Sequence, residues 1–116
     1  MTRQFVLEFI SHLDGWLSSH EGFFLYEAAK SKESKGEIME IGSWMGKSTI
    51  CLASGSMAAR REKVTAVDPH KGEFSGENGI GKKSPTFKKF IANLTKAGVA
   101  KWVMPLVATS EKAAKH

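Results

Sequence analysis

The sequence predicts an α/β protein in which helices flank a parallel sheet, and two patterns carry this prediction. Short apolar segments with strand character alternate with longer helical segments over residues 36–116. A turn with two glycines, over residues 42–46, joins the first of these strands to the helix that follows it. Strands that alternate with helices favour parallel βαβ units with right-handed crossovers. About three strands are therefore expected in one sheet.

Two helices are expected before the sheet. In the first, over residues 4–17, the apolar residues recur at helical spacing, and residues 14–15 indicate a break. Its apolar residues are Phe5, Phe9, Leu13 and Trp16. Ser18 or Ser19 can cap the second helix, which is expected to continue to residues 35–36. Its aromatic residues are expected in the core: Phe23, Phe24 and Tyr26.

The remaining elements form one alternating unit. They are expected as strand 38–41, helix 47–60, strand 63–68, polar loop 69–84, helix 86–99, strand 102–108 and the start of a helix at 111–116. The chain is therefore interpreted as a single domain over residues 1–116. N-terminal helices occupy residues 1–35, and a βαβαβ unit occupies residues 36–116.

The composition is that of a globular protein, with 41% hydrophobic residues, 25% charged residues and a net charge of +5. Its basic residues are scattered among acidic and polar ones, which is typical of solvated faces, so a nucleic-acid partner is not expected. The apolar stretches fall far short of the ~20 residues that cross a bilayer, and the N-terminus has no secretory pattern. A cytoplasmic protein is expected. The single cysteine, Cys51, is expected to be a buried small hydrophobe, and no metal site is predicted.

Three strand ends carry residues that indicate a ligand site. After the first strand, Gly42 lets the backbone turn, Gly46 lets the next helix approach the sheet, and that helix presents free backbone amides. Asp68 ends the second strand, where a carboxylate can accept hydrogen bonds from both hydroxyls of a ribose. Thr109 and Ser110 follow the third strand, in a position to meet the edge of a base. Because the carboxyl ends of parallel strands face one crevice, these residues together predict a nucleotide-like cofactor site.

These segments resemble a known enzyme family. Glu40-Ile-Gly-Ser-Trp-Met-Gly-Lys-Ser48, with Val67-Asp-Pro-His70 and Ala108-Thr-Ser-Glu111, is similar to the class I S-adenosylmethionine (SAM) dependent methyltransferases, in particular the catechol and macrocin O-methyltransferase-like branch. The resemblance covers nearly the whole chain, including Gly15-Trp-Leu-Ser18 and Glu21-Gly22 near the start. It implies a Rossmann-like fold with SAM as the cofactor. The cofactor-binding residues that it implies are Glu40, Gly42, Ser43, Trp44, Gly46 and Ser48 around the methionine portion, Asp68 at the ribose, and Pro69, His70 and Ser110 around the adenine.

The resemblance also implies transfer of a methyl group to a small-molecule acceptor. Trp44 stands where many members of the wider superfamily have glycine, and this favours the O-methyltransferase branch. The family's domain continues for roughly another half, with acidic residues on a fourth strand, so catalytic residues stay unassigned and only the first half of the fold is expected here. In such a half, strand 38–41 becomes an edge. The chain is therefore expected to form a homo-oligomer through this edge, most simply a two-fold dimer.

Three other interpretations remain open. Gly46-Lys-Ser-Thr49 imitates the end of an ATP-binding Walker A motif, although that motif would place its first glycine at the position of Ile41. An NAD-binding domain would also use an acid after the second strand, yet it would favour glycine at position 44 and a third glycine further on. The last is a non-catalytic interaction or nucleic-acid-binding module built on a partial cofactor fold. Salt-dependent binding to nucleic acid would identify such a module.

Overall fold

The computed structural model describes residues 2–33, 35–70 and 85–115. Its elements are α1 (Arg3–Ile10), α2 (Ser19–Lys30), β1 (Ile38–Ile41), α3 (Lys47–Ala58), β2 (Val64–Val67), α4 (Pro85–Lys96), the 3-10 helix η2 (Ala100–Trp102), β3 (Val103–Leu106) and α5 (Ser110–Ala113). The strands form one parallel sheet in the order β1-β2-β3, so the predicted α/β fold is confirmed. The predicted polar loop, apart from its first two residues, lies outside the described residues. No helix in the described part of the chain is long and apolar enough to cross a bilayer.

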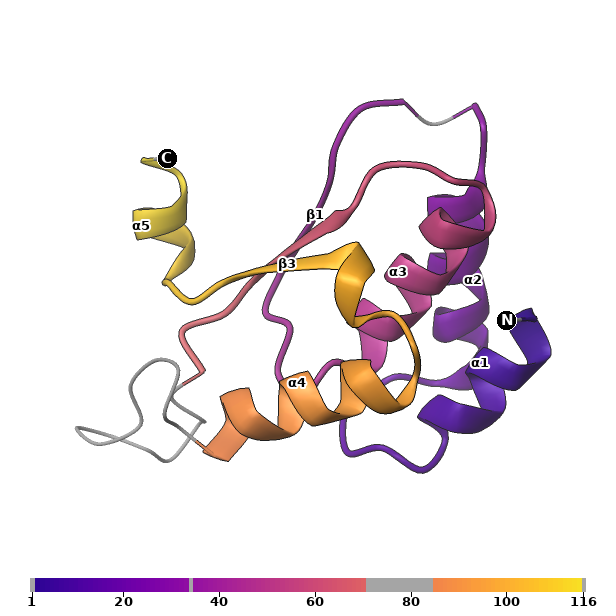
Figure 1. The fold of residues 1–116 in the computed structure, drawn as a ribbon, viewed down its shortest axis with the longest axis horizontal. Helices are drawn as coiled ribbons and strands as arrows, with labels where there is room; N and C mark the ends of the chain where they lie inside the picture. The colour runs from indigo at the N-terminus through magenta and orange to yellow at the C-terminus, as the bar shows by residue number, and fades with distance from the viewer. Residues whose placement is uncertain (1, 34, 71–84, 116) are drawn as a thin grey trace.

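One face of the sheet builds the core. Val64, Ala66 and Val103 pack there against side chains from four helices. The helical members are Val6 and Ile10 of α1, Tyr26 of α2, Ile50, Cys51 and Ala53 of α3, and Phe90, Leu94 and Ala97 of α4. Figure 1 shows α1, α2 and α3 gathered beside the sheet and α5 apart from them, beyond the end of β3. Burial, with a contribution from nearby Glu40, raises the pKa of the Cys51 thiol to about 12, so this cysteine is the buried hydrophobe expected.

Both N-terminal helices are shorter than predicted. α1 ends at Ile10, before the break that was predicted at residues 14–15. The second helix begins as expected, with a capping box on Ser18, but it ends at Lys30. There the guanidinium of Arg61 donates to the carbonyls of Ala29 (2.8 Å) and Ser31 (3.2 Å). Arg61 lies 32 residues after Ala29 and 30 residues after Ser31 in the sequence. The sequence of the helix alone therefore does not reveal where the helix ends.

The buried faces of these helices also differ from the prediction. The buried apolar residues are Val6 and Ile10 of α1 and Tyr26 of α2. Of the aromatic residues expected in the core, Phe23 (42%) and Phe24 (68%) are exposed instead. Phe5 (53%) and Trp16 (96%), from the apolar pattern of the first predicted helix, are exposed as well. Apolar residues in these segments occupy more than one helical face, so spacing fits several orientations and packing against α3 selects one of them. The exposed Trp16 lies in the loop that follows α1, beside the site described below.

Candidate functional site

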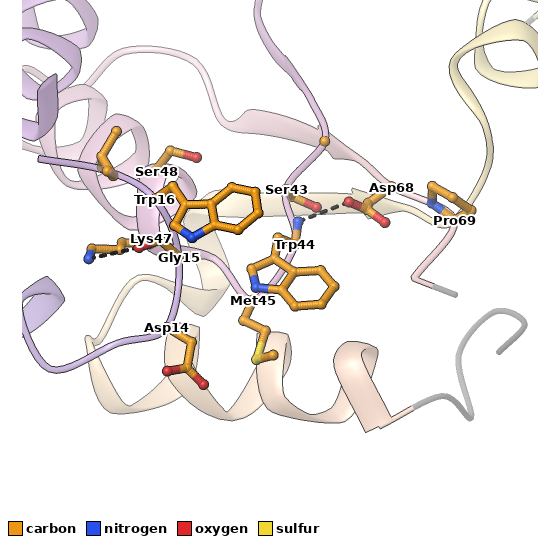
Figure 2. A pocket seen from close by; sticks show the side chains of 12 residues that line it. Asp14, Gly15, Trp16, Ser43, Trp44, Met45, Lys47, Ser48, Asp68 and Pro69 are labelled. Carbon is orange, nitrogen blue, oxygen red and sulfur yellow. Dashed lines mark hydrogen bonds between the residues drawn. The ribbon is translucent and has the colours of Figure 1, made fainter. Parts of the chain in front are cut away.

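A pocket of about 780 Å3 lies at the carboxyl ends of β1 and β2. Three segments line it: the loop between α1 and α2, the turn after β1 with the start of α3, and the end of β2 (Figure 2). The lining residues are Asp14, Gly15, Trp16, Leu17, Gly42, Ser43, Trp44, Met45, Lys47, Ser48, Asp68 and Pro69. Pockets of about 300–1,000 Å3 are typical of small-molecule and cofactor sites. The pocket therefore occupies the crevice that the strand ends predict.

The turn after β1 depends on three residues with left-handed backbone conformations. The φ angles are +86° at Gly42, +49° at Trp44 and +97° at Gly46. Residues with a side chain seldom adopt this region, and Trp44 is such a residue. Glycine, which many superfamily members carry at this position, adopts the same conformation without steric cost. A Cβ on Gly46 would lie 3.2 Å from the ring of Phe90. Since Phe90 belongs to α4, the expectation that Gly46 makes room for the sheet is wrong, because it makes room for this helix.

The start of α3 offers polar groups to the pocket. Gly46 is the N-cap of the helix and has no side chain, so no side-chain hydrogen bond covers the first backbone amides. Ser43 lines the pocket, and its hydroxyl is 99% buried without a hydrogen-bond partner. Within the described part of the protein, the hydrogen-bonding capacity of this hydroxyl is therefore unused. The positive end of the helix dipole favours an anionic group here.

Asp68 joins the end of β2 to the turn after β1. One carboxylate oxygen accepts a hydrogen bond from the backbone N–H of Trp44 (2.9 Å), and the other accepts one from the backbone N–H of His70 (2.7 Å). Figure 2 shows the bond to Trp44 crossing between the two segments. Each carboxylate oxygen can accept more than one hydrogen bond. Asp68 is therefore fixed in orientation and keeps acceptor capacity for a ligand in the pocket.

Glu40 of β1 lies behind the pocket lining and holds the first turn of α3. Its two carboxylate oxygens accept hydrogen bonds from the hydroxyls of Ser48 and Thr49. Burial raises the pKa of the Glu40 carboxyl; the two hydroxyl bonds act against this, and the charge of Asp68 adds to it. Of this group only Ser48 lines the pocket, so Glu40 reaches a ligand through that hydroxyl.

Two residues predicted on the adenine side do not line the pocket. His70 is 99% buried, and its ring packs against Phe87 and Phe90, with centroids 5.2 Å and 4.9 Å away. Ser110 is exposed at the start of α5, where the hydroxyl of Thr109 caps the helix. Pro69 is the residue of the predicted adenine side that lines the pocket. A ligand would have to extend past Pro69 to contact the other two.

The loop between α1 and α2 was part of the family resemblance, through Gly15-Trp-Leu-Ser18, but it was not assigned to the cofactor site. Asp14, Gly15, Trp16 and Leu17 form this wall, and Met45 and Lys47 were also unassigned. The available signal was a tryptophan next to a helix-breaking glycine, which places a large apolar side chain on a loop. Among the described residues, no group of three or more His, Cys, Asp or Glu side chains could hold a metal ion. The pocket lining combines two tryptophans, Trp16 and Trp44, with polar and charged side chains such as Ser43 and Asp68.

Comparison with known proteins identifies the family. No curated protein matches the chain significantly. The family model described as a methyltransferase domain matches residues 39–116, which is well over half of the 116-residue chain. The match spans the turn after β1, Asp68 at the end of β2 and the start of α5, so it includes two of the three segments that line the pocket. The chain therefore belongs to the methyltransferase-domain family.

Proposed function

We propose that the pocket binds SAM and that the protein transfers its methyl group to an oxygen of a small-molecule acceptor. The family supports methyl transfer, and methyltransferases typically take the methyl group from SAM. The resemblance of the turn after β1 to the catechol and macrocin O-methyltransferase-like branch supports the choice of an oxygen acceptor. Trp44 at its middle position carries that resemblance.

The observation that carries the proposal is the placement of Asp68. Its carboxylate lines the pocket and is held by two backbone N–H groups. The two neighbouring hydroxyls of a ribose are donors that match such a carboxylate. We assign the ribose to Asp68, the adenine to the side of Pro69, and the methionine portion to Gly42, Ser43 and Ser48 near the start of α3.

The chemistry follows from this arrangement. SAM supplies a methyl group on a positively charged sulfur, and the acceptor oxygen takes the methyl as the carbon–sulfur bond breaks and its electron pair stays on sulfur. Positioning the two reactants supplies much of the acceleration, and a base takes the proton of the acceptor. Among the described residues, Ser43 and the free amides of α3 fit the polar groups of the methionine portion. These residues bind and orient the donor; the proposal assigns none of them as the base.

Calorimetric titration tests the proposal. We expect SAM to bind more tightly than NAD or ATP, and Asp68→Ala to weaken SAM binding about tenfold or more, since a hydrogen bond to a charged group contributes ~1.5–3 kcal/mol. Lys63→Ala, a change at an exposed residue next to β2, is the matched control and should leave binding unchanged. Asp68→Asn removes the negative charge but keeps one oxygen that can accept a hydrogen bond from a backbone N–H group. Comparing it with Asp68→Ala therefore separates the contribution of the charge from that of the backbone hydrogen bonds.

Equal affinity of Asp68→Ala and Lys63→Ala for SAM would contradict the ribose assignment. Tighter binding of NAD or ATP than of SAM would contradict the cofactor. Thermal unfolding of each variant shows whether a loss of affinity comes from the pocket or from the loss of the fold.

A further inference from the structure

Three side chains of the segment Gly46-Lys-Ser-Thr49 donate hydrogen bonds to other parts of the chain, and the proposed function does not explain all of them. Ser48 and Thr49 hold Glu40 on β1, as described above. The ammonium of Lys47 reaches in another direction and donates a hydrogen bond to the carbonyl of Gly15 at 3.3 Å, across 32 residues of sequence. One turn of helix thus connects β1 to the loop between α1 and α2.

The stem of Lys47 fits the backbone of Gly15. Gly15 has a φ angle of +141°, and a Cβ added there would lie 3.3 Å from Cδ and 3.4 Å from Cβ of Lys47. The glycine backbone therefore lies directly on the aliphatic part of the lysine, while the ammonium binds its carbonyl. Both contacts are specific to a long side chain with a donor at its end.

The loop is anchored on both sides of Trp16. Gly15 is held by Lys47, and Leu17 packs against the hydrophobic core. Trp16 lies between these anchors and lines the pocket, although its side chain is 96% exposed. An indole in water gains no burial free energy in the free protein, so its placement at the pocket is set by the anchored backbone on either side.

Figure 2 shows Gly15 and Lys47 at the end of the pocket opposite Asp68 and Pro69. If Asp68 holds the ribose, the amino-acid end of SAM lies on the side of Gly15. We infer that Lys47 is a positioning residue that holds residues 14–17 as the wall over the amino-acid end of the methyl donor. This inference rests on the proposed function, and it assigns the lysine of the Walker-like segment to a contact within the protein.

Two ligands test the inference: S-adenosylhomocysteine, which carries the amino-acid end, and 5′-methylthioadenosine, which lacks it. Lys47→Met keeps most of the stem under Gly15 and removes the ammonium. We expect it to weaken S-adenosylhomocysteine binding about tenfold, the loss typical of one charge-assisted hydrogen bond, and to leave 5′-methylthioadenosine binding nearly unchanged. Lys47→Arg, which keeps a donor, should restore part of the affinity. Lys63→Met is the matched control and should change neither ligand's affinity.

Backbone 15N relaxation of the ligand-free protein provides a second readout. The order parameters of residues 15–17 should fall in Lys47→Met, with those of α3 unchanged, because the tether rather than the helix is lost. Unchanged order parameters in this loop, or equal weakening of both ligands, would overturn the inference. A wild-type protein that binds neither ligand overturns the proposed function and the donor part of the inference, whereas the relaxation result still decides whether the tether exists.

Discussion

The apolar side chains on the two faces of the sheet differ in their exposure to solvent, although both sets alternate along the same strands. On the face covered by the helices, Val64, Ala66 and Val103 are 0%, 1% and 6% exposed. On the opposite face, Met39, Ile41 and Met104 are 58%, 61% and 56% exposed. Successive side chains of a strand point to opposite faces, so this contrast reflects which face the described helices cover. Val67 of the central strand also points to the opposite face, where it pairs with Ile41, and it is 1% exposed. Burial within the chain therefore stabilises the fold chiefly through the helix-covered face of the sheet.

The pocket depends on the covered side. Gly46, at the start of α3, lies against Phe90 of α4, and His70, after β2, packs its ring on the same helix. The backbone N–H of His70 binds Asp68, and its carbonyl accepts a hydrogen bond from the hydroxyl of Thr86 on α4 (2.9 Å). The geometry of the site thus follows from packing in the helix-covered layer.

Matched truncations on the two layers give the largest expected difference. Phe90 is fully buried, so Phe90→Ala should lower the free energy of unfolding by ~3–5 kcal/mol through lost burial and a cavity. Met104 is 56% exposed, so Met104→Ala should change it by no more than ~0.5 kcal/mol. Urea denaturation measures both. Similar losses for the two variants would mean that the open face also stabilises the monomer.

These differences show what the sequence could predict. The strands, the glycine turn and Asp68 were predictable, because β-branched runs, positive-φ glycines and an acid at a strand end are local signals. The end of α2 was not, because it depends on Arg61 from a distant segment. The loop with Trp16 was not assigned to the pocket either, because its position depends on the contact of Lys47 with Gly15. Local patterns thus predict the scaffold, whereas long-range contacts complete the site.

The pH dependence of stability tests the covered layer separately, because His70, which packs on α4, is a titratable side chain of that layer. Burial lowers the pKa of His70 below its usual value of 6.5, while the charge of Asp68 acts in the opposite direction. The unfolded chain therefore binds the proton more readily, so the stability that neutral His70 contributes is present above pH 6.5 and is lost as the pH falls through the folded-state pKa. The pKa of Glu40 is raised by burial, so Glu40 has the opposite dependence. Its ionisation lowers the stability of the fold as the pH rises above 4.5, the usual pKa of the group.

We expect His70→Leu to flatten the fall in unfolding free energy as the pH drops below 6.5, an effect smaller than that of Phe90→Ala because a single proton is involved. His12→Leu, at an exposed histidine, is the matched control for the loss of an imidazole side chain. Urea denaturation at a series of pH values gives the comparison. A wild-type slope that persists in His70→Leu would assign the pH dependence to other groups.

The open face provides the last test, and its expected effect on folding is the smallest. Among the described residues, β1 is an edge of the sheet with β2 as its neighbour, and it carries Met39 and Ile41 exposed on the open face. Unpaired strand edges and exposed apolar side chains favour pairing with another chain, and two-fold dimers are the commonest closed assembly. We propose that two copies associate through the β1 edge and this face.

Ile41→Lys should shift the protein toward the monomer and should change the free energy of unfolding of the monomer itself by no more than ~0.5 kcal/mol, since the side chain is 61% exposed within one copy. A buried lysine at the contact would be unpaired, which strongly disfavours association. Phe24→Lys makes a comparable change at an exposed residue of α2, away from the sheet, and should leave association unchanged. Sedimentation velocity at micromolar concentration distinguishes these outcomes. A monomeric wild type, or equal dissociation in both variants, would rule out β1 as the interface and leave the open face without a role in self-association.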